Sequence, residues 1–192
     1  EDLHGINHTV KWSNKFNSNE TLDQSEYWYC NPAINSIFVK NANSAIFNSI
    51  NGEYSYNPLR PWRSLLQKIY LYFSQIKLTS VLMANHKIYI SPPIHDSKNK
   101  LIIGGNTKIR LIDISNKKVY VILKDGFDKK YINKEIYVRT NFTYLPIPKI
   151  TKLGNNNLWY CEEYIIGAPP NRILNNHRNT IITSAVLDIH KM

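Results

Sequence analysis

Short segments of alternating apolar and polar residues, joined by tight turns, constrain the fold of this chain more than any other feature. They begin at residue 86 and recur at 101–108, 109–115, 119–124, 150–153 and 158–166. A period of two is typical of β-strands, and connections of only a few residues make consecutive strands antiparallel. The sequence therefore predicts an antiparallel sheet over much of its C-terminal half.

One helical segment interrupts these strands. Apolar residues recur at helical spacing between Asp128 and Phe142, Glu135 lies midway, and Pro146 and Pro148 end the pattern. The predicted fold class is therefore α+β, with a five-stranded antiparallel sheet and one packed helix, preceded by a mixed N-terminal region. We expect an N-terminal region at 1–95, a sheet domain at 96–170 and a helical segment at 171–192.

The N-terminal region is predicted to contain two short strands and an amphipathic helix. Residues 26–30 and 36–39 have the aromatic and branched content of strands, and Asn51-Gly52 is a turn signal. A helix is predicted from Pro61 or Trp62 onward. Its apolar stripe consists of Trp62, Leu65, Leu66, Ile69, Tyr70, Phe73 and Ile76. The preferred interpretation is that this stripe covers a core, and a membrane surface or a partner protein is the alternative.

Amino-acid composition excludes few classes of function. The formal net charge of +10 favours anionic partners, but the basic residues are scattered, and abundant Asn, Ile, Lys and Tyr are what an AT-rich genome produces. Cys30 and Cys161 are too few for a disulfide framework, and the six histidines show no metal-ligand spacing. The most apolar stretch, 65–83, contains Lys68 and Lys77 and is not a membrane span. We expect a soluble cytoplasmic protein with no metal site.

The order of three strands, a helix, two strands and a break resembles the N-terminal lobe of the aminoglycoside phosphotransferase and choline kinase group of the protein-kinase-like fold. The resemblance covers about residues 98–192. The motifs that carry it are the glycine turn Gly104-Gly105-Asn106, the strand-ending Lys124, the helical Glu135, the segment 146–150, and Glu162-Glu163-Tyr164-Ile165-Ile166-Gly167. The segment 186–190 is similar to the helix end that precedes the catalytic loop of the group.

The resemblance implies a nucleotide-binding site. In a glycine turn, backbone N–H groups can approach phosphate oxygens closely, which assigns Gly104, Gly105 and Asn106 to the phosphates. Lys124 would reach the same phosphates, held in place by an ion pair with Glu135 as in kinases. The hinge residues Glu163, Tyr164 and Ile165 would hold adenine through backbone groups.

The resemblance also implies an activity. The full-length relative would transfer the γ-phosphoryl group of ATP to a hydroxyl of a small molecule, with Mg²⁺ as the metal. We expect its catalytic loop and metal ligands beyond Met192, so that no catalytic residue is assigned here and this part is inactive alone. The alternative is a non-catalytic binding module, either a degenerate kinase-like protein or a basic nucleic-acid binder that stacks bases on its aromatic residues.

Overall fold

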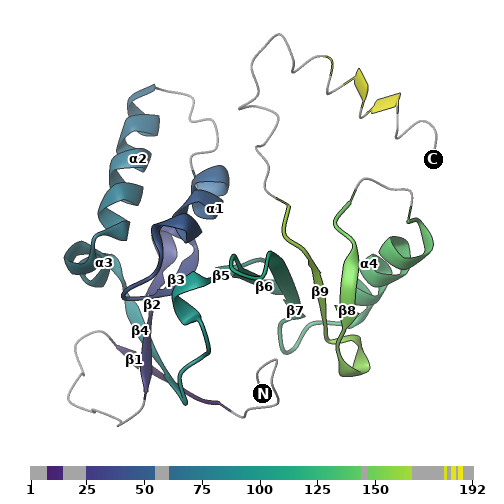
Figure 1. Ribbon diagram of the computed structural model, residues 1–192, viewed down its shortest axis with the longest axis horizontal. Helices are drawn as coiled ribbons and strands as arrows, with labels where there is room; N and C mark the ends of the chain where they lie inside the picture. Colours follow the sequence, from purple (N-terminus) through teal and green to yellow (C-terminus); the bar gives the residue numbers. More distant parts are fainter. Residues whose placement is uncertain are drawn as a thin grey trace.

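A computed structural model describes residues 8–14, 25–54, 61–143 and 147–165, together with positions 180, 183, 184, 186 and 187. Its centre is one nine-stranded sheet with the strand order β1-β4-β2-β3-β5-β6-β7-β9-β8, in which all paired strands are antiparallel. Helices α1 and α2 stand at one end of the sheet and α4 stands at the other (Figure 1).

The strands are β1 Thr9–Asn14, β2 Glu26–Asn31, β3 Ser36–Val39, β4 His86–Ser91, β5 Lys100–Gly104, β6 Lys108–Asp113, β7 Lys118–Leu123, β8 Ile150–Leu153 and β9 Trp159–Glu163. The helices are α1 Ser44–Tyr54, α2 Pro61–Gln75, α3 Lys77–Met83 and α4 Lys130–Asn141. Single 3-10 turns occupy Pro32–Ile34, Ser97–Asn99 and Asn155–Asn157.

The structure confirms the α+β class and the antiparallel sheet, but the predicted count of five strands is wrong. The sheet has nine strands because the N-terminal strands join the C-terminal ones through β3 and β5. Ser36 lies opposite Ile103, and Ile37 lies opposite Ile102. The sheet is thus continuous across the boundary expected at residue 95, a long-range pairing that local periodicity does not reveal.

Two apolar cores lie on the two faces of this sheet. The larger core unites strand residues Phe38, Leu101, Ile103, Ile112, Val119, Val121, Leu123 and Tyr160 with Ile46, Phe47 and Ile50 of α1, Leu71 of α2, and Ile132 and Ile136 of α4. Trp28, Val39, Ile88 and Ile90 form the smaller core with Ile94 and Ile102. Helices α1, α2 and α4 therefore all contribute to the larger core, on one face, whereas the loop that contains Ile94 covers part of the other face.

Most predicted elements agree with the structure, and two local predictions can be corrected or set aside. The helix expected at 128–142 is α4, and the helix expected from Pro61 is α2. The Asn51-Gly52 turn is wrong, because both residues lie inside α1, where burial of Ile46 and Ile50 outweighs the local turn signal. The helix expected near the C-terminus, like the segment around Gly167, lies largely outside the described residues.

Helix α2 is rotated so that most of its apolar stripe faces outward, whereas the preferred interpretation was that the stripe covers a core. Six of its predicted stripe residues are exposed, and only Tyr70 is partly buried. The side that packs against the protein instead contains Leu71 and Ser74, which are buried. Among the described residues, no helix is long and apolar enough to cross a membrane.

Candidate functional site

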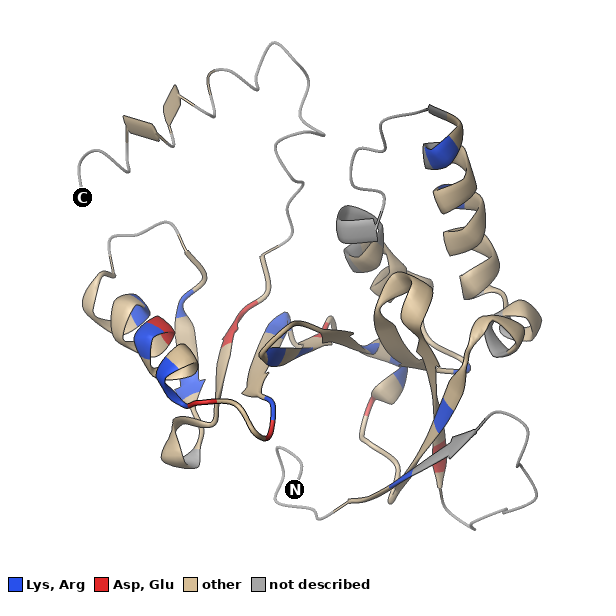
Figure 2. Ribbon diagram, turned by 180° about the vertical axis from the view of Figure 1, so that it is seen from behind, with Lys and Arg blue, Asp and Glu red and all other residues tan. Residues whose placement is uncertain are grey.

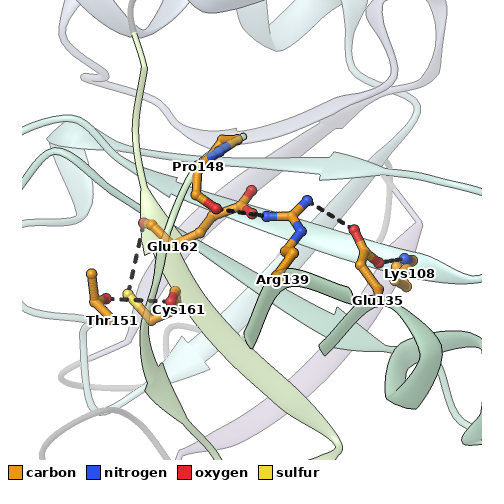
Figure 3. A network of polar contacts seen from close by, with 7 residues as sticks. All are labelled: Lys108, Glu135, Arg139, Pro148, Thr151, Cys161 and Glu162. Atoms are coloured by element: carbon orange, nitrogen blue, oxygen red, sulfur yellow. Dashed lines mark hydrogen bonds and ion pairs between the residues drawn. The ribbon is translucent and has the colours of Figure 1, made fainter. Parts of the chain in front are cut away.

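A network of charged side chains lies between α4 and the sheet (Figure 3). Lys108 of β6 forms an ion pair with Glu135 of α4. Arg139, one helical turn after Glu135, bridges it to Glu162 of β9. The network therefore connects two strands to one helix and joins residues up to 54 positions apart, the separation of Lys108 and Glu162.

Arg139 is the centre of this network. Its Nη2 lies 2.9 Å from Glu135 Oε1, and its Nη1 donates to both Glu162 Oε2 and the carbonyl oxygen of Pro148, the latter at 3.3 Å. The guanidinium carbon also lies 5.4 Å from the centre of the Tyr160 ring. The planar fork of an arginine suits such multiple contacts. Arg139 thus fastens α4 to β9 and to the segment that leads into β8.

The sheet register explains why these side chains meet. Lys108 lies opposite Leu123, and Glu162 lies opposite Val119. Residues directly opposite each other share a face of the sheet, and Leu123 and Val119 both belong to the larger core. Lys108 and Glu162 therefore point to the face that α4 covers, where Glu135 lies one helical turn from Arg139.

Glu135 is held in its charged form. Burial alone would raise the pKa of this carboxyl, but hydrogen bonds from Lys108 and Tyr160 and the charges of Lys108 and Arg139 lower it below its ordinary value. The pKa of Tyr160 moves the other way, because burial and then the charge of Glu135 raise it far above its ordinary value. Tyr160 therefore remains a protonated hydrogen-bond donor beside an ionised carboxylate.

Glu162 behaves differently from Glu135. Burial raises its pKa, and the opposing charge of Arg139 only partly offsets that effect. Burial would lower the pKa of Arg139, yet the charges of Tyr160, Glu162 and Glu135 raise it overall. The result is a site with one carboxylate whose pKa is lowered, Glu135, one whose pKa is raised, Glu162, and two basic side chains between and beside them, Lys108 and Arg139.

The lysine that contacts Glu135 is not the one predicted from the sequence. We expected Lys124 to pair with Glu135, and the structure gives Glu135 the partners Lys108 and Arg139 instead. Strand β7 ends at Leu123, which faces α4, so alternation directs the next residue to the opposite face. The sequence signal for Lys108 was weak, because Ile109 and Leu111 look like the inward-facing residues of that strand.

The glycine turn lies directly before Lys108. Gly104 ends β5, and the backbone N–H of Gly105 donates to the carbonyl oxygen of Lys108 at 2.8 Å. A Cβ on Gly105 would lie 2.9 Å from that same oxygen. The absence of a side chain at Gly105 therefore serves the closure of the turn. Asn106, at the tip, is exposed.

The predicted hinge follows β9. Glu163 is the last residue of that strand, Tyr164 is partly buried against the larger core, and Ile165 is exposed. The backbone N–H of Tyr164 donates to the carbonyl oxygen of Lys117 at 2.9 Å. This segment and the glycine turn lie near opposite ends of strand β7, because Lys118 at its start pairs with Glu163 and Leu123 at its end pairs with Lys108.

Two pockets lie away from the glycine turn. One, of about 270 Å³, opens between the end of α4 and the start of β8 and is lined in part by Arg139, Phe142 and Lys149. The second, of about 590 Å³, lies in the N-terminal half. Within the described part of the chain, no group of three His, Cys, Asp or Glu side chains could hold a metal ion.

The chain matches no protein-family model, and comparison with curated proteins and with solved structures gives no match. The resemblance to small-molecule kinases therefore remains a prediction from the sequence motifs.

Proposed function

We propose that residues 100–165 form the nucleotide-binding part of an ATP-dependent small-molecule phosphotransferase, with Lys108 rather than Lys124 as the phosphate-binding lysine. One observation carries this proposal: an ion pair between a sheet lysine and a helix glutamate, directly beside a glycine turn. An ammonium held by one carboxylate keeps further N–H donors for phosphate oxygens. The strand order β5-β6-β7-β9-β8, with α4 between β7 and β8 in the chain, supports the same assignment.

The arrangement of the site matches an extended, anionic ligand. The glycine turn and Lys108 lie near the end of strand β7, and the segment 163–165 lies near its start. A bound ATP would lie along β7, with its triphosphate at the glycine turn and its adenine at the segment 163–165. The described residues supply no cluster of metal ligands, so this proposal assigns no step to Mg²⁺.

ATP-induced thermal stabilisation tests the proposal. A ligand at about 100 times its Kd stabilises the folded state by about 2.7 kcal/mol, which corresponds to a rise in Tm of about 5–10 °C for a chain of this size. Lys108→Met should abolish this rise. Lys134→Met is the matched control, because Lys134 is an exposed lysine next to Glu135.

The comparison is made between Tm values with and without ATP for each variant, so that a change in intrinsic stability does not obscure the result. A rise in Lys108→Met equal to that of the wild type would refute the role of Lys108. Loss of the rise in Lys124→Met alone would return the role to Lys124. No rise in the wild type would refute nucleotide binding altogether.

A second candidate function, a binding module for single-stranded nucleic acid, is favoured by the larger pocket. Its lining includes Tyr27, Tyr29, Lys40, Lys87 and Lys98. Within the part of the chain that the structure describes, none of these lysines takes part in an ion pair. The sequence showed no strand in which basic and aromatic residues interleave, and the structure collects them from separate segments.

Binding of random-sequence single-stranded RNA tests this candidate. An affinity that falls steeply with salt, and that Lys40→Ala combined with Lys87→Ala weakens at least about tenfold, would support it. An affinity that neither salt nor these substitutions change would eliminate it.

A further inference from the structure

Within the described part of the chain, exposed apolar side chains gather on α2 and α3. We call this surface the α2–α3 stripe. Its residues, all between 38% and 74% exposed, are Trp62, Leu65, Leu66, Ile69, Tyr72 and Phe73 of α2, Ile76 between the helices, and Leu78 and Leu82 of α3. Along α2 the stripe runs from Trp62 to Phe73, about 17 Å at 1.5 Å per residue, and Ile76 lies between α2 and α3. Exposed apolar side chains gathered in this way on a protein surface mark an interaction site.

The opposite side of α2 packs against the protein through polar contacts. Asn31, completely buried in β2, accepts from the Tyr70 hydroxyl at 3.0 Å and donates to Ser74 Oγ at 3.4 Å. Ser74 Oγ in turn donates to the carbonyl oxygen of Tyr70 at 2.8 Å. Gln67 even buries an amide oxygen without a hydrogen-bond partner among the described residues. The hydrogen bonds of Asn31 with Tyr70 and Ser74 fix the rotation of α2 about its axis. The stripe therefore faces away from the rest of the described protein.

The charges around the stripe have one sign. At 100° per residue, Arg63 and Lys68 lie on the two flanks of the stripe, and both are exposed. The Arg63 guanidinium carbon is 5.5 Å from the Trp62 ring centre. Between Glu53 and Asp96 the sequence contains five lysines and arginines and no acidic residue. Figure 2 accordingly shows blue on α2 and no red on α2 or α3.

This charge pattern decides between the possible occupants of the stripe. A second copy would bring Arg63 and Lys68 against the same cations, with no carboxylate on the stripe to pair with them. Residues 166–192 of the chain also carry more basic than acidic side chains, three Lys and Arg against Asp188. An anionic lipid surface offers an apolar acyl-chain region for the stripe and negatively charged headgroups for the flanking cations.

We propose that the α2–α3 stripe binds the surface of anionic membranes, with α2 parallel to the membrane plane. The apolar residues of the stripe enter the boundary between headgroups and acyl chains, and Arg63 and Lys68 contact lipid phosphates from the two flanks. This proposal is independent of the nucleotide-binding proposal, because none of its residues belongs to the charged network beneath α4.

Flotation with lipid vesicles tests the proposal. The wild type should float with vesicles of equal parts phosphatidylcholine and phosphatidylserine and remain unbound with pure phosphatidylcholine. Leu65→Ser combined with Phe73→Ser should reduce the partition coefficient at least about tenfold. The matched control is Val138→Ser with Leu158→Ser, which also removes two exposed apolar side chains but lies outside the stripe. The control should bind as the wild type does.

The contribution of the flanking cations to vesicle binding, and the thermal stability of the variants, are measured next. Arg63→Gln combined with Lys68→Gln should weaken binding to the anionic vesicles at least about threefold, and the binding of the wild type should weaken with added salt. The Leu65/Phe73 variant should keep the Tm of the wild type, because these side chains are exposed.

Three results would overturn the proposal. The first is a wild type that does not float with anionic vesicles. The second is a fall in the Tm of the Leu65/Phe73 variant, which would mean that other parts of the chain cover the stripe. The third is a dimer in light scattering that the same two substitutions dissociate, which would assign the stripe to a second copy.

Discussion

The buried ion pair between Lys100 and Asp113 gives the sharpest test of what holds the sheet together. These residues face each other at the start of β5 and the end of β6, with 3.2 Å between Lys100 Nζ and Asp113 Oδ2. Their side chains are 6% and 2% exposed. Lys100 also donates to the carbonyl oxygen of His95 at 2.8 Å, and Asp113 accepts from the backbone and side-chain nitrogens of Asn116, both at 3.0 Å.

Lys100→Met removes the cation and leaves the Asp113 carboxylate buried. Breaking a buried pair from one side costs about 3–5 kcal/mol, because the remaining charge is uncompensated. For a chain of this size, each kcal/mol lowers Tm by about 2–4 °C, so the expected fall is about 6–20 °C. The Asn116 contacts still solvate Asp113 in part, which places the cost toward the lower end of that range.

Urea and thermal unfolding at neutral pH measure this cost. In the double variant, Lys100→Met with Asp113→Asn, no charge is buried and the Asn116 backbone N–H keeps an acceptor. We expect the double variant to be about 2 kcal/mol more stable than the single one. Lys98→Met, at an exposed lysine two residues earlier, should change stability by less than about 0.5 kcal/mol. A cost below about 1 kcal/mol for Lys100→Met, or no recovery in the double variant, would refute this reasoning.

Three further outcomes are expected from the charged network and the glycine turn. Because the pKa of Glu135 is lowered from 4.5 on folding, its ionisation stabilises the protein above that value. The stability difference between wild type and Glu135→Gln in urea should therefore be constant near neutral pH and shrink as the pH falls below 4.5 through the folded-state pKa. Arg139→Met should cost about 3 kcal/mol in the same assay, because it leaves two carboxylates without their shared partner, whereas Arg139→Lys should recover part of that cost. Gly105→Ala should lower Tm by several degrees, since the new Cβ would meet a backbone oxygen at 2.9 Å, and Asn106→Ala at the exposed tip should not.

The candidate site was predictable only in part. Glu135 was found because a single acidic residue in the middle of a predicted helix between strands is visible in the sequence, and α4 forms where the periodicity places it. Its lysine partner was missed because the choice between Lys108 and Lys124 depends on which face of the sheet the helix covers. Arg139 and Glu162 were not assigned to the site either, since their contact joins a helix to a strand 23 residues away.

The amphipathic helix illustrates the same limit. The sequence correctly predicts that α2 has a strongly apolar side, because that side follows from the spacing of six residues, Trp62 to Phe73, along one helix. It predicts the wrong side as buried, because the rotation of the helix is set by Asn31, a residue of a distant strand, through Tyr70 and Ser74.

The sequence by itself therefore determines most local elements of this protein: the strands other than β1, the helices α2 and α4, the glycine turn and the uniform positive charge of the segment that contains α2. Each depends on residues within a few positions of one another, whose side-chain periodicity and backbone preferences act locally. Tertiary structure alone decides that nine strands form one sheet, that Lys108 meets Glu135, and that the α2–α3 stripe faces outward. These outcomes depend on register and helix rotation, which are fixed by contacts between residues far apart in the chain.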